Sequence, residues 1–309
     1  MKIINDLKQP VLIACNDAGS ANIIAHWIKD LSGNDFIFHL GGPAVKIFKK
    51  LVKNFKNLPL KQAIKGCNSL ISGTGWASCL EHNARIEAKI KNIKSVAVID
   101  HWVNYKERFI FNDTTCFPNE IWVTDKHAFE IASNTFNNIK IKLLENIYLK
   151  NEVEKIVSYR SQFNLNESDN INILYVLEPI IKKWMENETC SGEFQALDFF
   201  KNNIHYFCEN PKNCVIYLKT HPSENYNKYD EWISNNSHLK IKLLPINEEL
   251  NKSISRSHWV VGCNTFAMVI ALKANIKVAS TIPKYGPKCD LPYKEIVIIR
   301  DLKIEQKCL

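Results

Sequence analysis

Six stretches of this 309-residue sequence place acidic, hydroxyl, amide or histidine side chains directly after a short apolar run. They occupy residues 11–20, 71–81, 98–108, 171–179, 214–224 and 259–272. Where such runs form parallel strands, the loops that follow them meet at one edge of the sheet and bind ligands there. The polar residues of these loops are therefore the candidates for chemistry.

The first loop carries a carboxylate at the end of the apolar run 11–15. Gly19 allows the backbone to turn tightly before a helix. We expect Asp17 to act as a general base toward a hydroxyl, with Gly19 and Ser20 next to a bound ligand. The alternative is structural, since Asp17 or Ser20 would also serve as the N-cap of the following helix.

The second loop places two glycines, a hydroxyl and an indole after the run 69–72. Gly73 and Gly75 would expose backbone amides at a helix N-terminus, and Thr74 and Trp76 would face a ligand. The full GxGxxG pattern with its downstream acidic residue is missing, which argues against a dinucleotide fingerprint. Plain helix capping is the alternative.

The third loop begins with Asp100 and His101 and continues with aromatic and basic residues. This density of functional groups directly after a strand predicts ligand contacts. The residues expected to stack on a ring or to meet an anionic group are Trp102, Tyr105, Lys106 and Arg108. In the alternative, Asp100 and His101 only form a buried hydrogen-bonded pair.

In the second half, His221 precedes Pro222 at the end of an apolar run, and Lys219 lies two residues before it. This arrangement suits a charge-assisted hydrogen bond to a leaving phosphate. Farther along, Asn264 and Thr265 precede an apolar helix, whose first amides and dipole would bind the same phosphate. Thr265 acting only as an N-cap is the alternative.

These loops require strands and helices that alternate, and short β-branched runs do alternate with helix-like segments along the chain. The expected strands are 11–15, 35–40, 69–72, 95–99, 120–123, 171–177, 214–220, 241–245, 259–262 and 277–279. The expected helices include 21–31, 77–91, 193–202 and 265–273. The polar stretch 156–170 is the expected linker between domains at 1–155 and 171–309. We predict an α/β fold of two Rossmann-like, doubly wound domains that face a central cleft.

The composition is that of a globular protein, with 46% hydrophobic and 23% charged residues. Its formal net charge of +8 comes mainly from dispersed lysines, and this dispersion argues against nucleic acid as a partner. Scattered positive charge favours phosphate-bearing substrates or weak attraction to anionic lipid at the inner membrane surface. The first residues resemble neither a signal peptide nor a membrane span, so we expect a cytoplasmic protein.

The ten cysteines include no CxxC pair and no Cys/His spacing typical of zinc sites. The chain also has no DxD pair or cluster of carboxylates along the sequence that would hold a divalent ion. We therefore expect free thiols, no metal ligands and no cofactor.

Taken together, these loops resemble those of the GT-B glycosyltransferases, and among them the bacterial CMP-sugar users such as sialyl-, polysialyl- and Kdo transferases. The sequence departs from their pattern at Asn16, where an acidic partner often stands, and at Asn264, which replaces a serine. These departures leave the donor sugar and the nucleotide open. The motifs similar to their acidic-x-Gly turn, His-Pro pair and Ser-Ser or Ser-Thr pair are Asp17-Ala18-Gly19, His221-Pro222 and Asn264-Thr265.

The resemblance implies an inverting, metal-independent transfer of a sugar, such as a CMP-activated nonulosonic acid or Kdo, to a surface glycan of capsule or lipopolysaccharide. Asp17 would take the acceptor proton, and His221 would support the departing CMP phosphate. Asn264 and Thr265 would hold that phosphate, and Glu178 would contact the nucleotide ribose. The domain 1–155 would then bind the acceptor and the domain 171–309 the donor.

Three other functions stay open, because a fold alone does not fix a function. A nucleotide-sugar 2-epimerase or hydrolase would need further carboxylates, which Asp100, Glu178 and Glu224 could supply. A CDP-glycerol-type glycerophosphotransferase would need a second catalytic histidine, for which His101 is the candidate. A non-catalytic module that only binds sugar nucleotides is the third.

Overall fold

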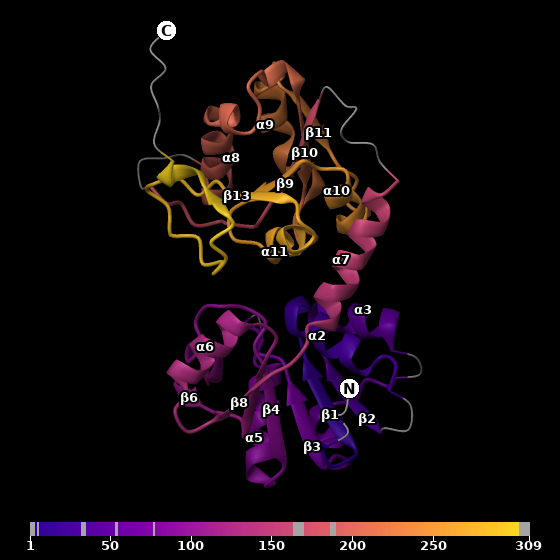
Figure 1. The fold of residues 1–309 in the computed structure, drawn as a ribbon. Coiled ribbons are helices and arrows are strands. Elements are labelled where there is room, and N and C mark those ends of the chain that lie inside the picture. Colours follow the sequence, from indigo (N-terminus) through magenta and orange to yellow (C-terminus); the bar gives the residue numbers. More distant parts are fainter. Residues whose placement is uncertain are drawn as a thin grey trace. The chain divides into compact units, whose positions relative to one another are not determined.

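The computed structural model describes residues 4, 6–31, 35–52, 55–76, 78–162, 170–185 and 190–302. The chain divides into two compact units, Met1–Tyr148 (unit 1) and Leu149–Leu309 (unit 2). Each unit is built on a six-stranded sheet whose neighbouring strands all run parallel (Figure 1).

The sheet of unit 1 has the strand order β2-β1-β3-β4-β7-β8. Its strands are β1 (Val11–Cys15), β2 (Phe36–Leu40), β3 (Ser69–Ser72), β4 (Lys94–Val98), β7 (Glu120–Val123) and β8 (Lys140–Leu143). Val11 pairs with Phe36 on one side and with Ser69 on the other, so β1 is central. All five residues of β1 are buried, as expected for a strand covered on both faces.

Helices cover both faces of this sheet. They are α2 (Ala18–Ile28), α3 (Gly42–Leu51), α4 (Leu60–Ala63), α5 (Leu80–Ile90) and α6 (Lys126–Thr135). Because successive strand side chains point to opposite faces, Val11 and Ile13 join the core beneath α2 and α3. Leu12 and Ala14 join the separate core beneath α4 and α5.

A short antiparallel hairpin that the sequence did not predict lies between β4 and β7. It follows the 3-10 turn η1 (Glu107–Phe109) and consists of β5 (Ile110–Phe111) and β6 (Thr114–Thr115). The two residues between its strands, Asn112 and Asp113, have positive φ angles of 45° and 58°. Two positive φ angles are the backbone signature of tight hairpin turns, and Asn and Asp tolerate them best after glycine.

The sheet of unit 2 has the strand order β11-β10-β9-β12-β13-β14. Its strands are β9 (Ile171–Val176), β10 (Cys214–Lys219), β11 (Lys240–Leu243), β12 (Trp259–Gly262), β13 (Lys277–Ser280) and β14 (Val297–Ile298). Its helices are α8 (Gly192–Asn202), α9 (Asp230–Asn235), α10 (Leu250–Ser255) and α11 (Phe266–Lys273). One core cluster packs α8 and α9 against the sheet through residues such as Tyr175, Phe200 and Trp232.

All ten predicted strands are present, with ends that differ by at most two residues. The two-domain, doubly wound α/β prediction is therefore confirmed. Two edge strands were missed, because β14 has only two residues and β8 alternates lysine with apolar residues over four positions.

The boundary between the units precedes the linker that we predicted at 156–170. The helix α7 (Ile147–Arg160) begins at the end of unit 1, so residues 156–160 are helical. Residues 163–169 lie outside the described part of the chain. The helix was missed because Ile156 is its one buried residue, and a helix without an apolar stripe has no period to detect.

Each sheet has a point at which the chain reverses its direction of travel across the sheet. In unit 1 this switch point lies between β1 and β3, and in unit 2 it lies between β9 and β12. Open α/β sheets bind ligands at the carboxyl ends of the strands beside such a point. The loops after these four strands are therefore the candidate sites.

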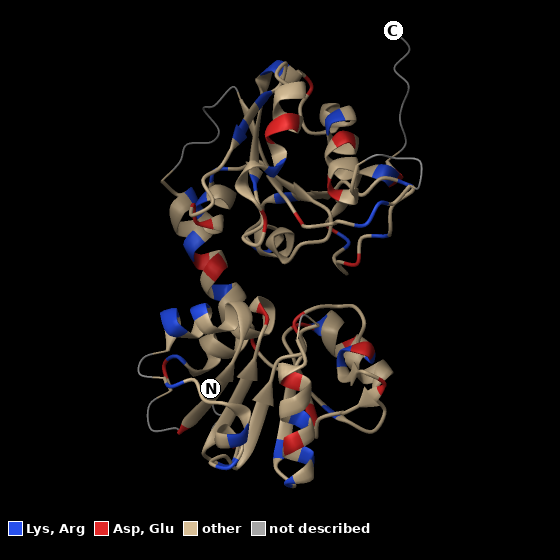
Figure 2. Cartoon of the chain, turned by 180° about the vertical axis from the view of Figure 1, so that it is seen from behind, with Lys and Arg blue, Asp and Glu red and all other residues tan. Residues whose placement is uncertain are grey.

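Charge is spread over both units. Figure 2 shows Lys and Arg residues distributed among Asp and Glu over helices and loops, in agreement with the dispersed lysines of the sequence. In the part of the chain that the structure describes, every helix is too short or too polar to cross a bilayer.

Candidate functional site

Asp17 occupies the loop directly after β1, at the switch point of unit 1. Its Oδ1 accepts a hydrogen bond of 2.5 Å from the Ser20 hydroxyl, one turn into α2. Burial and then the charge of Asp100 raise the pKa of Asp17 to about 6, against the opposing effect of the Ser20 hydrogen bond. Asp17 also stands at the N-cap position of α2, but its side chain makes no capping hydrogen bond to the helix backbone.

The glycines of this region lie where carboxylates press against the backbone. A Cβ added to Gly19 would meet Asp100 Oδ2 at 1.7 Å, and one added to Gly75 would meet Asp17 Oδ2 at 2.5 Å. Neither position therefore tolerates a side chain while the acids keep their places. The structure thus brings Asp17, Gly19, Ser20, Gly75 and Asp100 together beside the ends of β1, β3 and β4.

Asp100 is paired with Arg108, a residue of η1. The guanidinium Nη1 lies 3.1 Å from Asp100 Oδ1 and 3.2 Å from the carbonyl oxygen of Thr74. The same guanidinium stacks over the Trp76 ring at 5.1 Å, and this indole is 53% exposed. Arg108 therefore links the loops after β3 and β4 and compensates the charge of Asp100.

Three predicted ligand contacts are corrected by burial. Thr74 is 0% exposed and donates its hydroxyl to the Val98 carbonyl at 3.0 Å. Trp102 is 6% exposed, and its indole N–H contacts both Asp125 carboxylate oxygens at 3.1 Å. Tyr105 is 4% exposed and stacks on an internal phenylalanine. These side chains hold the loops in place, and Trp76 is the exposed aromatic residue of the region.

The remaining residue of this loop, His101, is half-buried. Its ring lies 5.3 Å from the Trp102 ring. Asp100 pairs with Arg108, because η1 folds back toward the end of β4.

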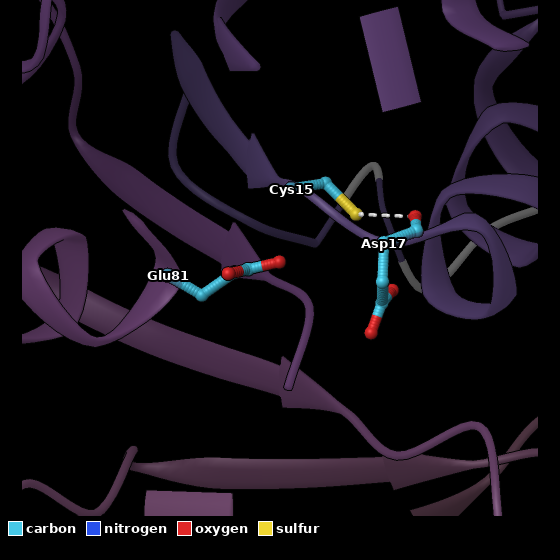
Figure 3. Close-up of side chains that lie close together, drawn as sticks. All are labelled: Cys15, Asp17 and Glu81. Atoms are coloured by element: carbon cyan, nitrogen blue, oxygen red, sulfur yellow. Dashed lines mark hydrogen bonds between the residues drawn. The ribbon is translucent and has the colours of Figure 1, made fainter. Parts of the chain in front are cut away.

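Sequence reasoning missed Glu81, which stands in the first turn of α5. Its Oε1 accepts the Asn16 backbone N–H at 2.6 Å and so ties α5 to the Asp17 loop. Burial and the charge of Asp17 raise the pKa of Glu81 above its ordinary value. Figure 3 shows the Glu81 carboxylate pointing toward Cys15 and Asp17. The only sequence signal was an acidic residue nine positions after a strand end, which is too common to single out.

In unit 2, Glu178 binds protein amides. Its Oε1 accepts the backbone N–H groups of Cys263 at 3.0 Å and Asn264 at 2.7 Å. Burial raises the pKa of Glu178 to about 7, although these hydrogen bonds oppose the shift. Glu178 thus occupies amides that we had assigned to a phosphate, and it organises the loop after β12.

The other predicted phosphate ligands of unit 2 also have internal partners. Lys219 donates its ammonium to the carbonyls of Pro245 and Ile246 at 2.9 and 3.1 Å, where it ties two loops together. Asn264 donates to Asp290 at 2.8 Å and accepts the Asp290 amide at 2.9 Å. Thr265 is the N-cap of α11, which was the structural alternative.

His221 offers a nitrogen to a ligand at the end of β10. Its Nδ1 accepts the Ser223 backbone N–H at 3.3 Å and lies 2.7 Å from the Ser223 hydroxyl. An accepting Nδ1 assigns the proton of the neutral ring to Nε2. Partial desolvation by the surrounding protein lowers the pKa of His221, so the neutral ring is the form to consider at pH 7. His221 and Pro222 are both exposed, as a ligand contact requires.

No protein-family model matches this chain, and no curated protein sequence does. Solved structures do match it. UDP-GlcNAc 2-epimerase from Neisseria meningitidis bound to UDP-GlcNAc is 11% identical, with a TM-score of 0.59 over 91% of this chain and 84% of that chain. UDP-GlcNAc 2-epimerase from Methanocaldococcus jannaschii, in complex with UDP-GlcNAc and UDP, is 9% identical, with a TM-score of 0.58 over 87% and 83%. MurG from Acinetobacter baumannii is 11% identical, with a TM-score of 0.51 over 87% and 77%.

This chain has the GT-B fold. At such low identity the similarity concerns the fold alone, and the fold prediction is confirmed by it. The two epimerase structures contain UDP or a UDP-sugar by name, and neither supports the narrower resemblance to CMP-sugar transferases.

Proposed function

We propose that this chain is a nucleotide-sugar-dependent glycosyltransferase in which Asp17 accepts the proton of the acceptor hydroxyl. The observation that supports it best is the position of Asp17, which follows the central strand β1 at the switch point of unit 1. Ligands of this fold class bind at that edge. Asp100 is paired with Arg108, and Glu81 accepts the Asn16 backbone N–H, so Asp17 is the carboxylate of this group that is left to accept a proton.

His221 is the proposed donor to the departing phosphate, through its Nε2–H. Lys219 and the amide of Asn264 are engaged inside the protein, so the proposal assigns them no ligand contact. Protein donors would then meet the charge that develops on the phosphate. Removing one such donor typically costs about 3 kcal/mol of transition-state stabilisation.

The proposed substrates are a nucleotide sugar and a surface glycan. The sequence resemblance supports a CMP-sugar, whereas the names of the two epimerase structures support a UDP-sugar. A thermal-shift panel of CMP, CDP, UDP and GDP decides between them, because a nucleotide that binds the folded chain raises its melting temperature. A panel without any shift would contradict the proposal.

The second candidate is a nucleotide-sugar 2-epimerase, and one observation favours it. Asp17, Glu81 and Asp100 all lie around the loops after β1 and β4, which supplies the additional carboxylates that proton transfer at a sugar carbon would need. Incubation of the selected nucleotide sugar in deuterated water separates the two reactions. Deuterium at C2 of the recovered sugar indicates epimerisation, and transfer to an acceptor without it indicates the transferase.

Asp17→Asn tests the proposed base with the shape of the side chain preserved. General-base catalysis is worth about 100- to 10,000-fold, so turnover of the selected nucleotide sugar should fall by such a factor while nucleotide binding persists. Asp113→Asn, at the exposed hairpin turn, is the matched control and should turn over normally. Near-normal turnover by Asp17→Asn would show that the base lies elsewhere.

A further inference from the structure

Three side chains with metal-ligating atoms meet beside the switch point of unit 1. They are the Cys15 thiol at the end of β1, the Asp17 carboxylate two residues later and the Glu81 carboxylate of α5. One ligand atom from each lies within 4.8 Å of the other two. In Figure 3 the Glu81 carboxylate is directed at the space next to Cys15 and Asp17.

An oxygen of Glu81 lacks the partner that its burial requires. Glu81 is 1% exposed, and its Oε2 has no hydrogen-bond partner among the described residues. Its other oxygen already accepts the Asn16 amide. Leaving a buried polar atom unsatisfied costs about 1–3 kcal/mol, and native structures rarely do so. The orphaned oxygen therefore indicates that a further group belongs at this place.

The charge of the cluster points to a cation as that group. Two carboxyl groups and a thiol are gathered here, and neither Asp17 nor Glu81 forms an ion pair within the described ranges of the chain. The neighbouring arginines act on Glu81 and Asp17 through their charge only, because their hydrogen bonds go to other acceptors. Arg108 pairs with Asp100 at 3.1 Å, and Arg85 donates to the Gly73 carbonyl at 2.9 Å.

We propose that Cys15, Asp17 and Glu81 bind a divalent transition-metal ion of the zinc type. A thiolate with two carboxylates suits zinc or cobalt better than magnesium or calcium, which prefer oxygen ligands alone. Three protein ligands would leave a fourth position open in a tetrahedral site. Ser20 contacts both Cys15 Sγ, at 3.2 Å, and Asp17 Oδ1, and it would orient these two ligands.

This site differs from the metal-free expectation that we drew from sequence. The sequence did not indicate the site because its ligands come from two distant segments of the chain. A cysteine at the end of a buried strand is also indistinguishable by sequence from a small apolar core residue. The metal would sit at the acid cluster of unit 1 and not at the nucleotide phosphate. A metal-bound Asp17 carboxylate cannot accept a proton at the same time, so the metal-bound chain would not carry out the transfer proposed above.

Cobalt(II) titration of the full chain, stripped of metal beforehand, tests the proposal without any substrate. We expect one equivalent of cobalt to produce a near-ultraviolet thiolate-to-cobalt absorption band, which zinc then abolishes by displacement. Cys15→Ser should lose the band. Glu81→Gln should weaken cobalt binding by at least about tenfold. Substituting a residue that only supports a metal ligand already costs about that much, so loss of a ligand should cost no less. Cys67→Ser, which removes another buried thiol of unit 1, should keep the band.

Two results would overturn the proposal. One is a wild-type chain that gives no band and no zinc-dependent rise in melting temperature. The other is a band that survives Cys15→Ser, since the thiolate would then belong to another cysteine. If Cys15→Ser fails to fold, the other two variants decide the question. The proposal then requires Glu81→Gln to bind cobalt about tenfold more weakly while Cys67→Ser binds it as tightly as the wild type. Because no outcome uses turnover, a failed transferase assay leaves this test intact.

Discussion

The carboxylate of Glu178 makes the stability of unit 2 depend on pH. It lies at the end of β9 and accepts two backbone N–H groups of the loop after β12. Burial raises its pKa from 4.5 to about 7, so the folded chain keeps this proton in a pH range where the unfolded chain has lost it. A carboxyl group of this kind destabilises the fold as the pH rises.

The size of the effect follows from the two pKa values. Below pH 4.5 the group is protonated in both states, and above pH 7 it is ionised in both, so its contribution is constant in each range. Between them the free energy of unfolding falls with rising pH. Each pH unit between the two values is worth about 1.4 kcal/mol, which gives a total of about 3 kcal/mol as an upper limit, since solvent reaches part of the residue.

Glu178→Gln isolates this effect, because the amide oxygen still accepts both N–H groups and carries no charge. We expect the variant to match the wild type at pH 4.5 and to exceed it by about 2–3 kcal/mol at pH 8. Differential scanning calorimetry measures it, since the two units can unfold in separate transitions. Glu178→Ala should be destabilised at both pH values, because it strands the two amides. An equal offset of Glu178→Gln at both pH values would refute the reasoning.

Three further predictions concern other parts of the chain. Gly19→Ala should lower the free energy of unfolding by about 1–3 kcal/mol in urea titrations, because the added Cβ would collide with Asp100. Gly66→Ala is the control and should lower it less, because the added Cβ meets only the flexible end of a side chain, at 3.0 Å. Burial raises the pKa of Glu120, but hydrogen bonds from two lysines and a tryptophan outweigh it and lower the pKa to about 2. Glu120→Gln should therefore lower the free energy of unfolding by about 2 kcal/mol at pH 7 and leave it unchanged near pH 2. His221→Ala should weaken nucleotide binding about tenfold by calorimetry without changing the melting temperature, since it removes an exposed donor.

The sequence predicted the architecture well because hydrophobic pattern and strand burial have the same cause. β1 is an unbroken apolar run, and in the structure it is buried on both faces. The strands that escaped prediction lie at sheet edges, where one side is open and the apolar pattern is short. The helix α7 escaped for the related reason that little of its surface packs against other elements.

The sequence also located the loops of the candidate site, but it could not assign the partners within them. Position after a strand identified Asp17, Asp100 and Glu178 as residues at the carboxyl ends. Whether each faces a ligand or the protein depends on contacts across tens of residues. Glu178 meets amides 85 and 86 positions away, and no local pattern reports such a distance.

In unit 1 the glycines of the candidate site lie directly against side chains of the same site, so the two kinds of residue depend on each other. We expected Gly73 and Gly75 to expose amides at the start of a helix, yet α5 begins only at Leu80. A Cβ at Gly73 would instead meet the Ser20 hydroxyl at 2.4 Å, just as Gly75 faces Asp17. Each glycine therefore makes room for a side chain of a neighbouring segment of the chain. Substitutions at a glycine and at the acid it faces should accordingly be non-additive, since removing either partner relieves the same collision.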